Sequence, residues 1–361
     1  MAIVFFHQNQ ISDQGGIERY LSALIDRAKP NAVLVTGADS SGSCSCPCLF
    51  VRLPLRRMVP KWLSYAFGVL LAAGRIRRHI KSVGSCTLEF SRPEYILFSW
   101  IFTGAKVFTI HGTGPSSSEG AKYWLHYFST LIIPFAADVV QIVGRDQSGL
   151  PSWTLARMRS KVRNLDAWHD EVFRTFPFRD IDGPLKVFYA GRLAAMKNPE
   201  LLFRIIHAAD RVTDRKFEFR YFGADQDLIP AGIRQIFPSA GFLNAHELAR
   251  AIADCHVGIL CSGYGEGSPF IVAEALACGR AFVLPPLLGL LKAYQNYRGI
   301  VFADDYTVDA FIAALTKVQD AIRTGLTPES ISANVAGRNK TEVAERIVRQ
   351  LEADQVETCR K

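Results

Sequence analysis

The sequence lacks any hydrophobic run long enough to cross a lipid bilayer as a helix. Its longest uncharged stretch in the first third covers residues 62–74, whereas a spanning helix needs about 20 residues. The first seven residues also lack the basic region and long apolar core of a signal peptide. Both absences favour a cytoplasmic protein whose chain begins with a buried strand.

Metal-binding and dinucleotide-binding signatures are also missing. Cys44, Cys46 and Cys48 alternate without zinc-ribbon spacing, so we interpret them as part of a polar loop with free thiols. The pairs Asp180/Asp182 and Asp225/Asp227 have a spacing that often arises by chance, and we interpret them as surface acids. No Gly-x-Gly-x-x-Gly motif occurs. We therefore predict neither a metal nor a cofactor.

The composition is that of a globular protein with an excess of positive charge. The chain has 361 residues, of which 49% are hydrophobic and 21% charged, which allows two domains with sizeable cores. Its net charge of +8 favours anionic partners: nucleic acid, an anionic membrane or a phosphorylated substrate. Because no nucleic-acid-binding motif appears, we do not expect nucleic acid among them.

Short apolar runs alternate with amphipathic stretches in two successive rounds, which predicts parallel sheets covered by helices. We expect an α/β protein with two Rossmann-like, doubly wound domains facing a cleft. The predicted boundaries are a first domain at 1–172, a linker at 173–184, a second domain at 185–329 and a helical tail at 330–361, which could pack back on the first domain. The predicted strands are 3–7, 32–36, 86–90, 106–111, 138–143, 185–191, 216–223, 257–261 and 281–284. The predicted helices are 17–28, 61–80, 199–210, 246–253 and 269–278.

The segment from Glu266 to Gly279 is the most informative part of the chain. Ser268 is a good N-cap and Pro269 suits a first helical position, so a helix should begin here. Glu266 would then lie on the preceding loop and Glu274 on the second turn. A helix N-terminus favours anions. The two carboxylates should therefore face a different group, such as a sugar hydroxyl.

Three further motifs follow predicted strands. Gly15 and Gly16 open a helix and could let a backbone approach a phosphate, although a simple turn explains them too. Gly191 precedes Arg192 and Lys197, two cations at a strand end that could clamp a diphosphate or lie solvated on a surface loop. His111 closes a strand before a glycine-rich loop, where a contact with substrate is the alternative to a structural role.

In order and spacing, these motifs together resemble family 4 of the GT-B glycosyltransferases. These retaining enzymes use nucleotide-sugar donors, and the resemblance covers nearly the whole chain. It implies that Glu274 binds the ribose, Glu266 the donor sugar, and Arg192 with Lys197 the diphosphate. The other implied donor-binding residues are Gly15, Gly16, Gly191, Gly241, Phe242, Leu243, Gly267, Ser268, Pro269 and Phe270.

The resemblance further implies the activity. We expect a hexose to move from a UDP- or GDP-sugar to a glycan or lipid-linked acceptor in cell-surface polysaccharide synthesis. Arg192, Lys197, Glu266 and His111 would be the catalytic residues, with no metal and no covalent nucleophile. Residues 285–292 depart from the family pattern, which leaves open a donor contact there. Alternatives are a phosphorylase or epimerase with this fold, or a non-catalytic scaffold.

Residues 62–74 provide a hypothesis about membrane binding. This apolar stretch is flanked on both sides by arginines and lysines, a pattern typical of a helix that lies at an anionic membrane surface. The inner face of the plasma membrane would be that surface. A basic helix packed on the sheet explains the same pattern, so both interpretations stay open.

Overall fold

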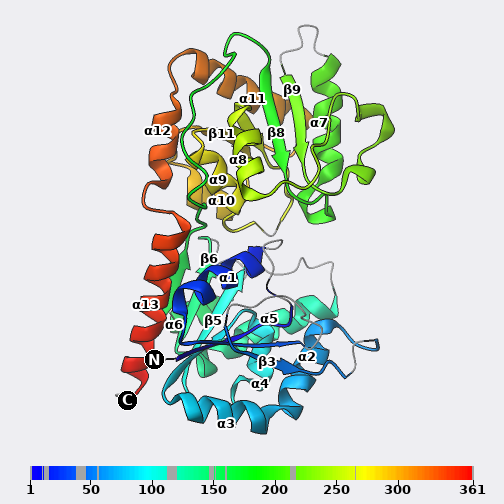
Figure 1. Cartoon of the computed structure of the whole chain (residues 1–361). Coiled ribbons are helices and arrows are strands. Elements are labelled where there is room, and N and C mark those ends of the chain that lie inside the picture. The colour runs from blue at the N-terminus through cyan, green and yellow to red at the C-terminus, as the bar shows by residue number, and fades with distance from the viewer. Residues whose placement is uncertain are drawn as a thin grey trace. The chain divides into compact units, whose positions relative to one another are not determined.

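The computed structural model describes residues 2–9, 11, 16–37, 46–54, 57–111, 120–145, 150, 152–158, 161–211, 217–264 and 266–359 (Figure 1). The chain forms two compact units. The first unit contains residues 1–143, 147–165 and 341–361. The second contains residues 144–146 and 166–340.

The first unit is built on a sheet of seven strands in the order β3-β2-β1-β4-β5-β6-β7. All pairings are parallel, and the central strands are buried on both faces, as parallel strands usually are. In chain order the strands are β1 (Ala2–Phe6), β2 (Ala32–Gly37), β3 (Cys48–Val51), β4 (Cys86–Phe90), β5 (Ala105–His111), β6 (Val139–Val143) and β7 (Val162–Leu165).

Helices cover both faces of this sheet. One face packs on α2 to α6 through an aromatic core that includes Tyr65 and Phe98. On the other face, Tyr20 of α1 donates a hydrogen bond to Gln141 of β6 (2.9 Å), and Thr87 of β4 donates one to the Leu351 carbonyl of α13 (2.6 Å). The helices are α1 (Gly16–Ala28), α2 (Lys61–Leu71), α3 (Ala73–Val83), α4 (Ile96–Ser99), α5 (Ala121–Ala136), α6 (Ser152–Met158) and α13 (Lys340–Cys359).

The second unit has a sheet of five parallel strands in the order β12-β11-β10-β8-β9. A single buried core joins these strands to the surrounding helices. The strands are β8 (Leu185–Ala190), β9 (Phe217–Phe222), β10 (Val257–Ile259), β11 (Ala281–Leu284) and β12 (Ile300–Phe302). The helices are α7 (Pro199–Arg211), α8 (Ala245–Ala253), α9 (Phe270–Ala277), α10 (Leu288–Tyr294), α11 (Val308–Arg323) and α12 (Pro328–Ser332).

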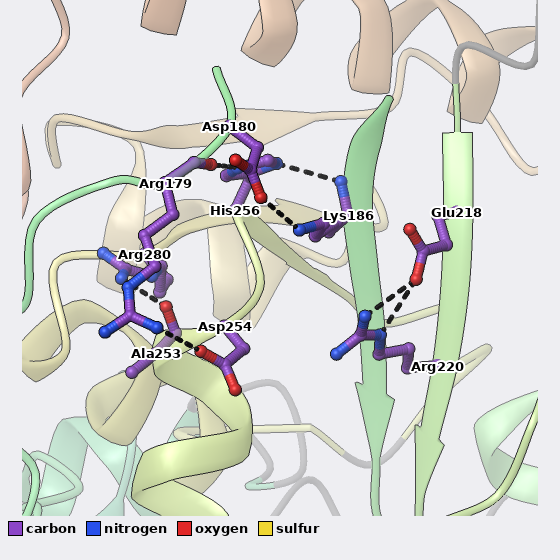
Figure 2. Close-up of polar contacts among 9 residues, drawn as sticks. All are labelled: Arg179, Asp180, Lys186, Glu218, Arg220, Ala253, Asp254, His256 and Arg280. Atoms are coloured by element: carbon purple, nitrogen blue, oxygen red, sulfur yellow. Dashed lines mark hydrogen bonds and ion pairs between the residues drawn. The ribbon is translucent and has the colours of Figure 1, made fainter. Parts of the chain in front are cut away.

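A polar cluster lies at the amino-terminal edge of this second sheet (Figure 2). Arg280 is fully buried, and its guanidinium donates hydrogen bonds to the carbonyls of Phe176 (2.8 Å), Pro177 (2.9 Å) and Ala253 (2.6 Å). His256 accepts a hydrogen bond from the Lys186 N–H (2.9 Å), and burial lowers the pKa of its imidazole. These bonds fasten the segment before β8 to the unit, which is a structural role.

The structure confirms both rounds of strands and helices but differs from the predictions in two places. The predicted helix 61–80 is two helices, because the chain breaks at Ala72. Cys48 begins strand β3, so the polar-loop interpretation was wrong for this residue; Cys44 lies outside the described residues. Among the described helices, none is both long and apolar enough to span a membrane.

Candidate functional site

Seven of the predicted site residues, Gly191, Arg192, Lys197 and Glu266 to Pro269, lie on two loops of the second unit, and a third loop holds one of these loops in place. Each loop follows the carboxyl end of a strand: residues 191–198 follow β8, 223–225 follow β9, and 260–264 with 266–269 follow β10. These strands are neighbours in one parallel sheet, so their carboxyl ends share one edge. Ligands of doubly wound folds bind at this edge.

Lys197 and Glu266 form an ion pair between the loops after β8 and β10. Ser262 donates a second hydrogen bond to the same carboxylate oxygen of Glu266 (2.8 Å). The Glu266 side chain is 7% exposed and that of Lys197 is 24% exposed. Burying a charge is costly unless the charge is paired. Each member of this group therefore keeps the others in place.

The loop after β8 is held by groups on strand β9 and on the loop that follows it. Asp225 accepts a hydrogen bond from the Leu193 N–H (2.7 Å), and the Tyr221 hydroxyl donates to the Gly191 carbonyl (3.0 Å). Asp225 is half-buried and organises this loop, so the prediction of a surface acid was wrong for this residue. Gly191 has a φ of +133°, a conformation that favours glycine. Arg192 remains exposed.

The start of α9 differs from the prediction. Pro269, not Ser268, occupies the N-cap position, and it makes no side-chain capping bond. The Ser268 hydroxyl instead accepts a hydrogen bond from the Ala167 N–H (2.9 Å) and shares one with the Tyr294 hydroxyl (3.1 Å). Ser268 therefore bonds to two residues that are distant in sequence and does not cap the helix. These bonds fix the loop that precedes α9.

Glycine is required where this loop meets the segment after β6. A Cβ atom on Gly144, which belongs to the second unit, would lie 2.5 Å from the Gly267 carbonyl carbon. Gly144 also has a φ of +101°. At the helix start, Phe270 packs edge-on against Trp168 with ring centroids 5.1 Å apart. The backbone that precedes α9 is therefore tightly positioned.

Glu274 lies in the second turn of α9, as predicted, and is 1% exposed. The helix ends at Ala277, and Gly279, two residues further on, has a φ of +73° that is typical of a residue just past a helix. The predicted contact between Glu274 and a ribose stays a prediction.

Residues 241–243 lie beyond the carboxyl end of β9. The preceding segment follows β9 in parallel, because the Tyr221 N–H donates to the Pro238 carbonyl (2.9 Å) and the Ala240 N–H donates to the Tyr221 carbonyl (2.9 Å). Gly241 has a φ of +75°. Phe242 is 63% exposed, so its ring offers a free aromatic surface near the loops that follow β8 and β9.

His111 and Gly16 belong to the first unit, and each is described within that unit alone. Gly16 begins α1, whereas Gly15 lies outside the described residues. His111 ends β5 and packs edge-on against Tyr20, with ring centroids 5.1 Å apart. Burial, assisted by the charges of His7 and Arg92, lowers the pKa of His111 to about 3. His111 is therefore neutral at physiological pH.

Sequence reasoning missed two residues that position the site. Ser262 supports Glu266, and Tyr306 in turn donates a hydrogen bond to the Ser262 carbonyl (3.2 Å). A serine directly after the predicted strand 257–261 was a usable signal for Ser262. No local pattern marks Tyr306, because its partner lies 44 residues away in sequence.

No three His, Cys, Asp or Glu side chains cluster as metal ligands within the described ranges.

Residues 184–320 match the family model described as glycosyl transferases group 1. No curated protein matches the chain in sequence.

Solved structures share the fold at low sequence identity. Anabaena HepE in complex with UDP and glucose is 13% identical with a TM-score of 0.70, covering 98% of this chain and 100% of HepE. The apo lipopolysaccharide outer core galactosyltransferase WaaB is 14% identical with a TM-score of 0.71, covering 98% and 99%. Sucrose-phosphate synthase from Thermosynechococcus elongatus is 14% identical with a TM-score of 0.66, covering 99% and 97%.

The chain therefore has a GT-B-like fold with two Rossmann-like domains, which confirms the predicted fold class. The family match in the second unit, together with this fold, supports an enzyme of the glycosyltransferase class.

Proposed function

We propose that the chain is a retaining, metal-independent family 4 glycosyltransferase that moves a hexose from a UDP- or GDP-sugar to a glycan or lipid-linked acceptor in cell-surface polysaccharide synthesis. The observation that carries this proposal is the group of Lys197, Glu266 and Ser262. It lies at the ligand-binding edge of a Rossmann-like sheet, inside the segment that matches the glycosyl transferases group 1 model. HepE, which has the same fold, was solved with UDP and glucose.

In this proposal the second unit binds the donor. Glu274 accepts hydrogen bonds from the ribose, and Glu266 binds hydroxyls of the transferred sugar. The backbone of 267–270 lines the donor, with the partial positive charge of the α9 N-terminus facing the negative charge of the donor. Residues 241–243 line the base, and the exposed ring of Phe242 supports this role because it can stack on a base.

Arg192 and Lys197 stabilise the departing diphosphate. A glycosyl transition state resembles an oxocarbenium ion, and negative charge grows on the leaving group. Fixed cations aimed at that charge lower the barrier. Arg192 is exposed and can turn to the phosphates, while Lys197 already lies beside the carboxylate that would hold the sugar.

Glu266 is not assigned as a nucleophile. One of its carboxylate oxygens receives both the Lys197 ammonium and the Ser262 hydroxyl. Charge-assisted hydrogen bonds of this kind stabilise the carboxylate and reduce its tendency to attack carbon. These partners suit a residue that orients sugar hydroxyls. His111, neutral by virtue of its low pKa, is proposed to donate or accept a hydrogen bond with the sugar.

The donor site can be tested by ligand-induced stabilisation. A ligand that binds only the native state raises its melting temperature. We expect a shift with UDP, GDP or their sugars, and a smaller shift in the Glu274→Gln variant. A panel without any stabilising nucleotide would contradict the proposal. Release of UDP or GDP only after acceptor addition, without added phosphate, separates transfer from phosphorolysis.

The same proposal places the enzyme at the cytoplasmic face of an anionic membrane, with the first unit in contact with lipid. Along α5, Trp124, Phe128, Ile132 and Phe135 are 56%, 54%, 48% and 68% exposed and recur at helical spacing. On α6, the ring of Trp153 lies 6.0 Å from that of Phe135. Aromatic rings are favoured at membrane interfaces.

Residues 62–74, the stretch for which the sequence suggested membrane binding, expose fewer apolar side chains than that hypothesis requires. Phe67, Leu70 and Leu71 of α2 are exposed, but Trp62 is half-buried. α2 contacts α4, α4 contacts α5, and α5 contacts α6, so these exposed side chains belong to one helical layer. Between residues 40 and 118 the sequence has ten Lys and Arg residues but two acids, Glu89 and Glu94. Both acids are buried, so this segment contributes more positive than negative charge to the first unit, which favours binding to anionic lipid.

Vesicle co-sedimentation tests this surface. We expect the protein to bind vesicles that contain phosphatidylglycerol at low salt, and the double variant Phe128→Ser/Ile132→Ser to bind at least about tenfold more weakly. The control is Leu228→Ser, which changes a 60% exposed leucine of the second unit. Equal binding by the double variant and the wild type would contradict the placement on α5.

A further inference from the structure

The strand order of the first sheet contains a switch point. From β1 the strand order runs to β2 and β3 on one side, and from β4 to β7 on the other. The order therefore reverses between β1 and β4. In open α/β sheets, ligands bind beyond the carboxyl ends of the strands at such a point.

Polar residues follow both strands, β1 and β4, at this switch point. Phe6 of β1 pairs with Phe90 of β4, so Gln8 and Arg92 each come two residues further along their strands. Tyr95 connects them: its hydroxyl accepts a hydrogen bond from the Gln8 N–H (3.1 Å), and its own N–H donates to the Arg92 carbonyl (3.3 Å). The two side chains thus start from one small region of the sheet edge.

At this switch point, His7 forms a hydrogen-bond network with Ser91 and Glu18. His7 is fully buried; its Nδ1 lies 2.8 Å from the Ser91 hydroxyl and its Nε2 lies 3.3 Å from a carboxylate oxygen of Glu18. Asn9 also donates to that oxygen (3.0 Å). Burial lowers the pKa of His7, and the Ser91 hydroxyl also donates to the Phe6 carbonyl (3.0 Å). These contacts hold His7 and Ser91 in place.

At the carboxyl edge of this sheet, three polar side chains have a buried atom without a partner within the described part of the chain. Arg92 makes no side-chain hydrogen bond or ion pair there, and its Nε is buried. Gln8 Oε1 and His111 Nε2 are likewise buried without a partner. A buried unpaired donor or acceptor costs about 1–3 kcal/mol, and native proteins leave few of them. Of these, Arg92 and Gln8 are linked through Tyr95 and together offer a cationic donor beside a neutral hydrogen-bonding group.

The surrounding charge favours an anion. The Arg92 charge is felt at both His7 and His111, because it helps to lower each pKa. Of the nearby acids, Glu18 is bonded to His7 and Asn9, and Glu94 is bonded to His126 (3.0 Å). Neither acid forms an ion pair with Arg92. The guanidinium is thus open to an external oxyanion, which it can bind through two parallel N–H groups.

We infer that Arg92 and Gln8 form a subsite for the phosphate of a phosphorylated sugar or polyol, with Arg92 on the phosphate and Gln8 on a neighbouring hydroxyl. This inference rests on the proposed function in one respect, since the ligand would be the acceptor of the transferred sugar. The phosphate can belong to a soluble molecule or to a lipid headgroup, because both present the same group to Arg92.

Calorimetric titration of the full chain tests this subsite. The probes are inorganic phosphate, glycerol 3-phosphate and glycerol, each added with and without saturating UDP. We expect glycerol 3-phosphate to bind more tightly than phosphate in both conditions, and glycerol not to bind. Arg92→Gln should weaken glycerol 3-phosphate binding at least tenfold, whereas Arg92→Lys, which keeps the charge but loses the fork, should weaken it less.

The matched control is Arg78→Gln, which removes an exposed arginine of α3 and should leave binding unchanged. Circular dichroism melting of each variant verifies that the fold is intact. If Arg92→Gln failed to fold, the comparison of Arg92→Lys with wild type would decide the question. Equal affinity of wild type and folded Arg92 variants, or equal binding of glycerol and glycerol 3-phosphate, would overturn the inference.

The source of the phosphate is decided by a parallel arm. Vesicles with phosphatidic acid should retain wild type more strongly than the Arg92→Gln variant if the ligand is a lipid headgroup, and equally if it is soluble. UDP binding tests the proposed donor site independently of this subsite. A chain that fails to bind UDP but binds glycerol 3-phosphate through Arg92 would contradict the donor site and leave this subsite standing.

Discussion

The two units differ in whether their buried polar side chains have hydrogen-bond partners. In the second unit, the buried charges of Glu266 and Arg280 have identified partners. In the first unit, buried polar atoms of Glu89, Arg92 and His111 have no hydrogen-bond partner among the described residues. Of all such unpartnered atoms in the described chain, only Arg280 Nε lies in the second unit.

We interpret the paired side chains as structural and the unpaired side chains at the sheet edge as groups that bind a ligand. Satisfied charges such as Arg280 hold the fold, while a paired but partly exposed charge such as Lys197 can exchange its partner for a substrate. Unpaired groups at a sheet edge indicate a partner from outside the chain. An unpaired acid inside the core, such as Glu89, has another solution, which is to stay protonated.

The largest expected effect concerns the structural cluster of the second unit. Arg280→Ala should lower the free energy of unfolding by about 3–5 kcal/mol, because it leaves several buried carbonyls without donors. Urea denaturation measures this loss. The control Arg179→Ala removes an exposed pair with Asp254, in which the side chains are 72% and 52% exposed, and should cost less than about 1 kcal/mol. Equal losses would contradict the structural role.

The second effect separates catalysis from stability at the carboxyl-terminal edge. Lys197→Met should reduce turnover by about a hundredfold or more, because the leaving diphosphate loses a fixed cation. It also leaves Glu266 buried without its charged partner. The double variant Lys197→Met/Glu266→Gln should regain stability but not turnover. The exposed Lys317 (58%) provides the control Lys317→Met. A Lys197→Met enzyme with normal turnover would exclude the proposed clamp.

The third effect concerns Glu89 in the first unit. Burial raises the pKa of this carboxyl to about 8, outweighing the opposing effect of the Thr109 hydroxyl. The folded protein therefore keeps a proton that the unfolded chain releases near pH 4.5, and stability should fall as pH rises between these values. Glu89→Gln removes this dependence. Its stability relative to wild type should increase by about 2–4 kcal/mol from pH 5 to pH 9.

Chemical denaturation of both proteins at several pH values measures that difference, and other titrating groups cancel in the comparison. A constant difference between the variant and wild type would show that Glu89 does not change its protonation state in this range.

The smallest effect tests the revised role of Ser268. Ser268→Ala should destabilise the protein by about 1–2 kcal/mol, because the Ala167 N–H and the Tyr294 hydroxyl lose a buried partner. The cost should be nearly the same in a Tyr294→Phe background if the bond to Ala167 dominates. Thermal unfolding measures both. A change below about 0.3 kcal/mol would show that these bonds contribute little.

Much of the fold could be predicted because parallel strands with two buried faces give continuous apolar runs. The same reasoning placed Lys197, Glu266 and Glu274 on or beside the carboxyl edge of the second sheet. It did not foresee that Lys197 pairs with Glu266, since 69 residues separate them. It assigned Ser268 to a cap because local rules consider only neighbours in sequence. Arg92 carried no motif, and its interest arises only from the strand order.

The sequence by itself determined the alternation of strands and helices, the helix that carries Glu274 and the excess of positive charge, since these depend on composition and local periodicity. Only the tertiary structure decided which polar groups meet. The pairing of β1 with β4 brings Gln8 and Arg92 to one edge of the first sheet. Packing gives Ser268 and Asp225 hydrogen-bond partners that are distant in sequence. The physical reason is that burial makes hydrogen bonding obligatory, and the partner that satisfies a buried group is chosen by proximity in space.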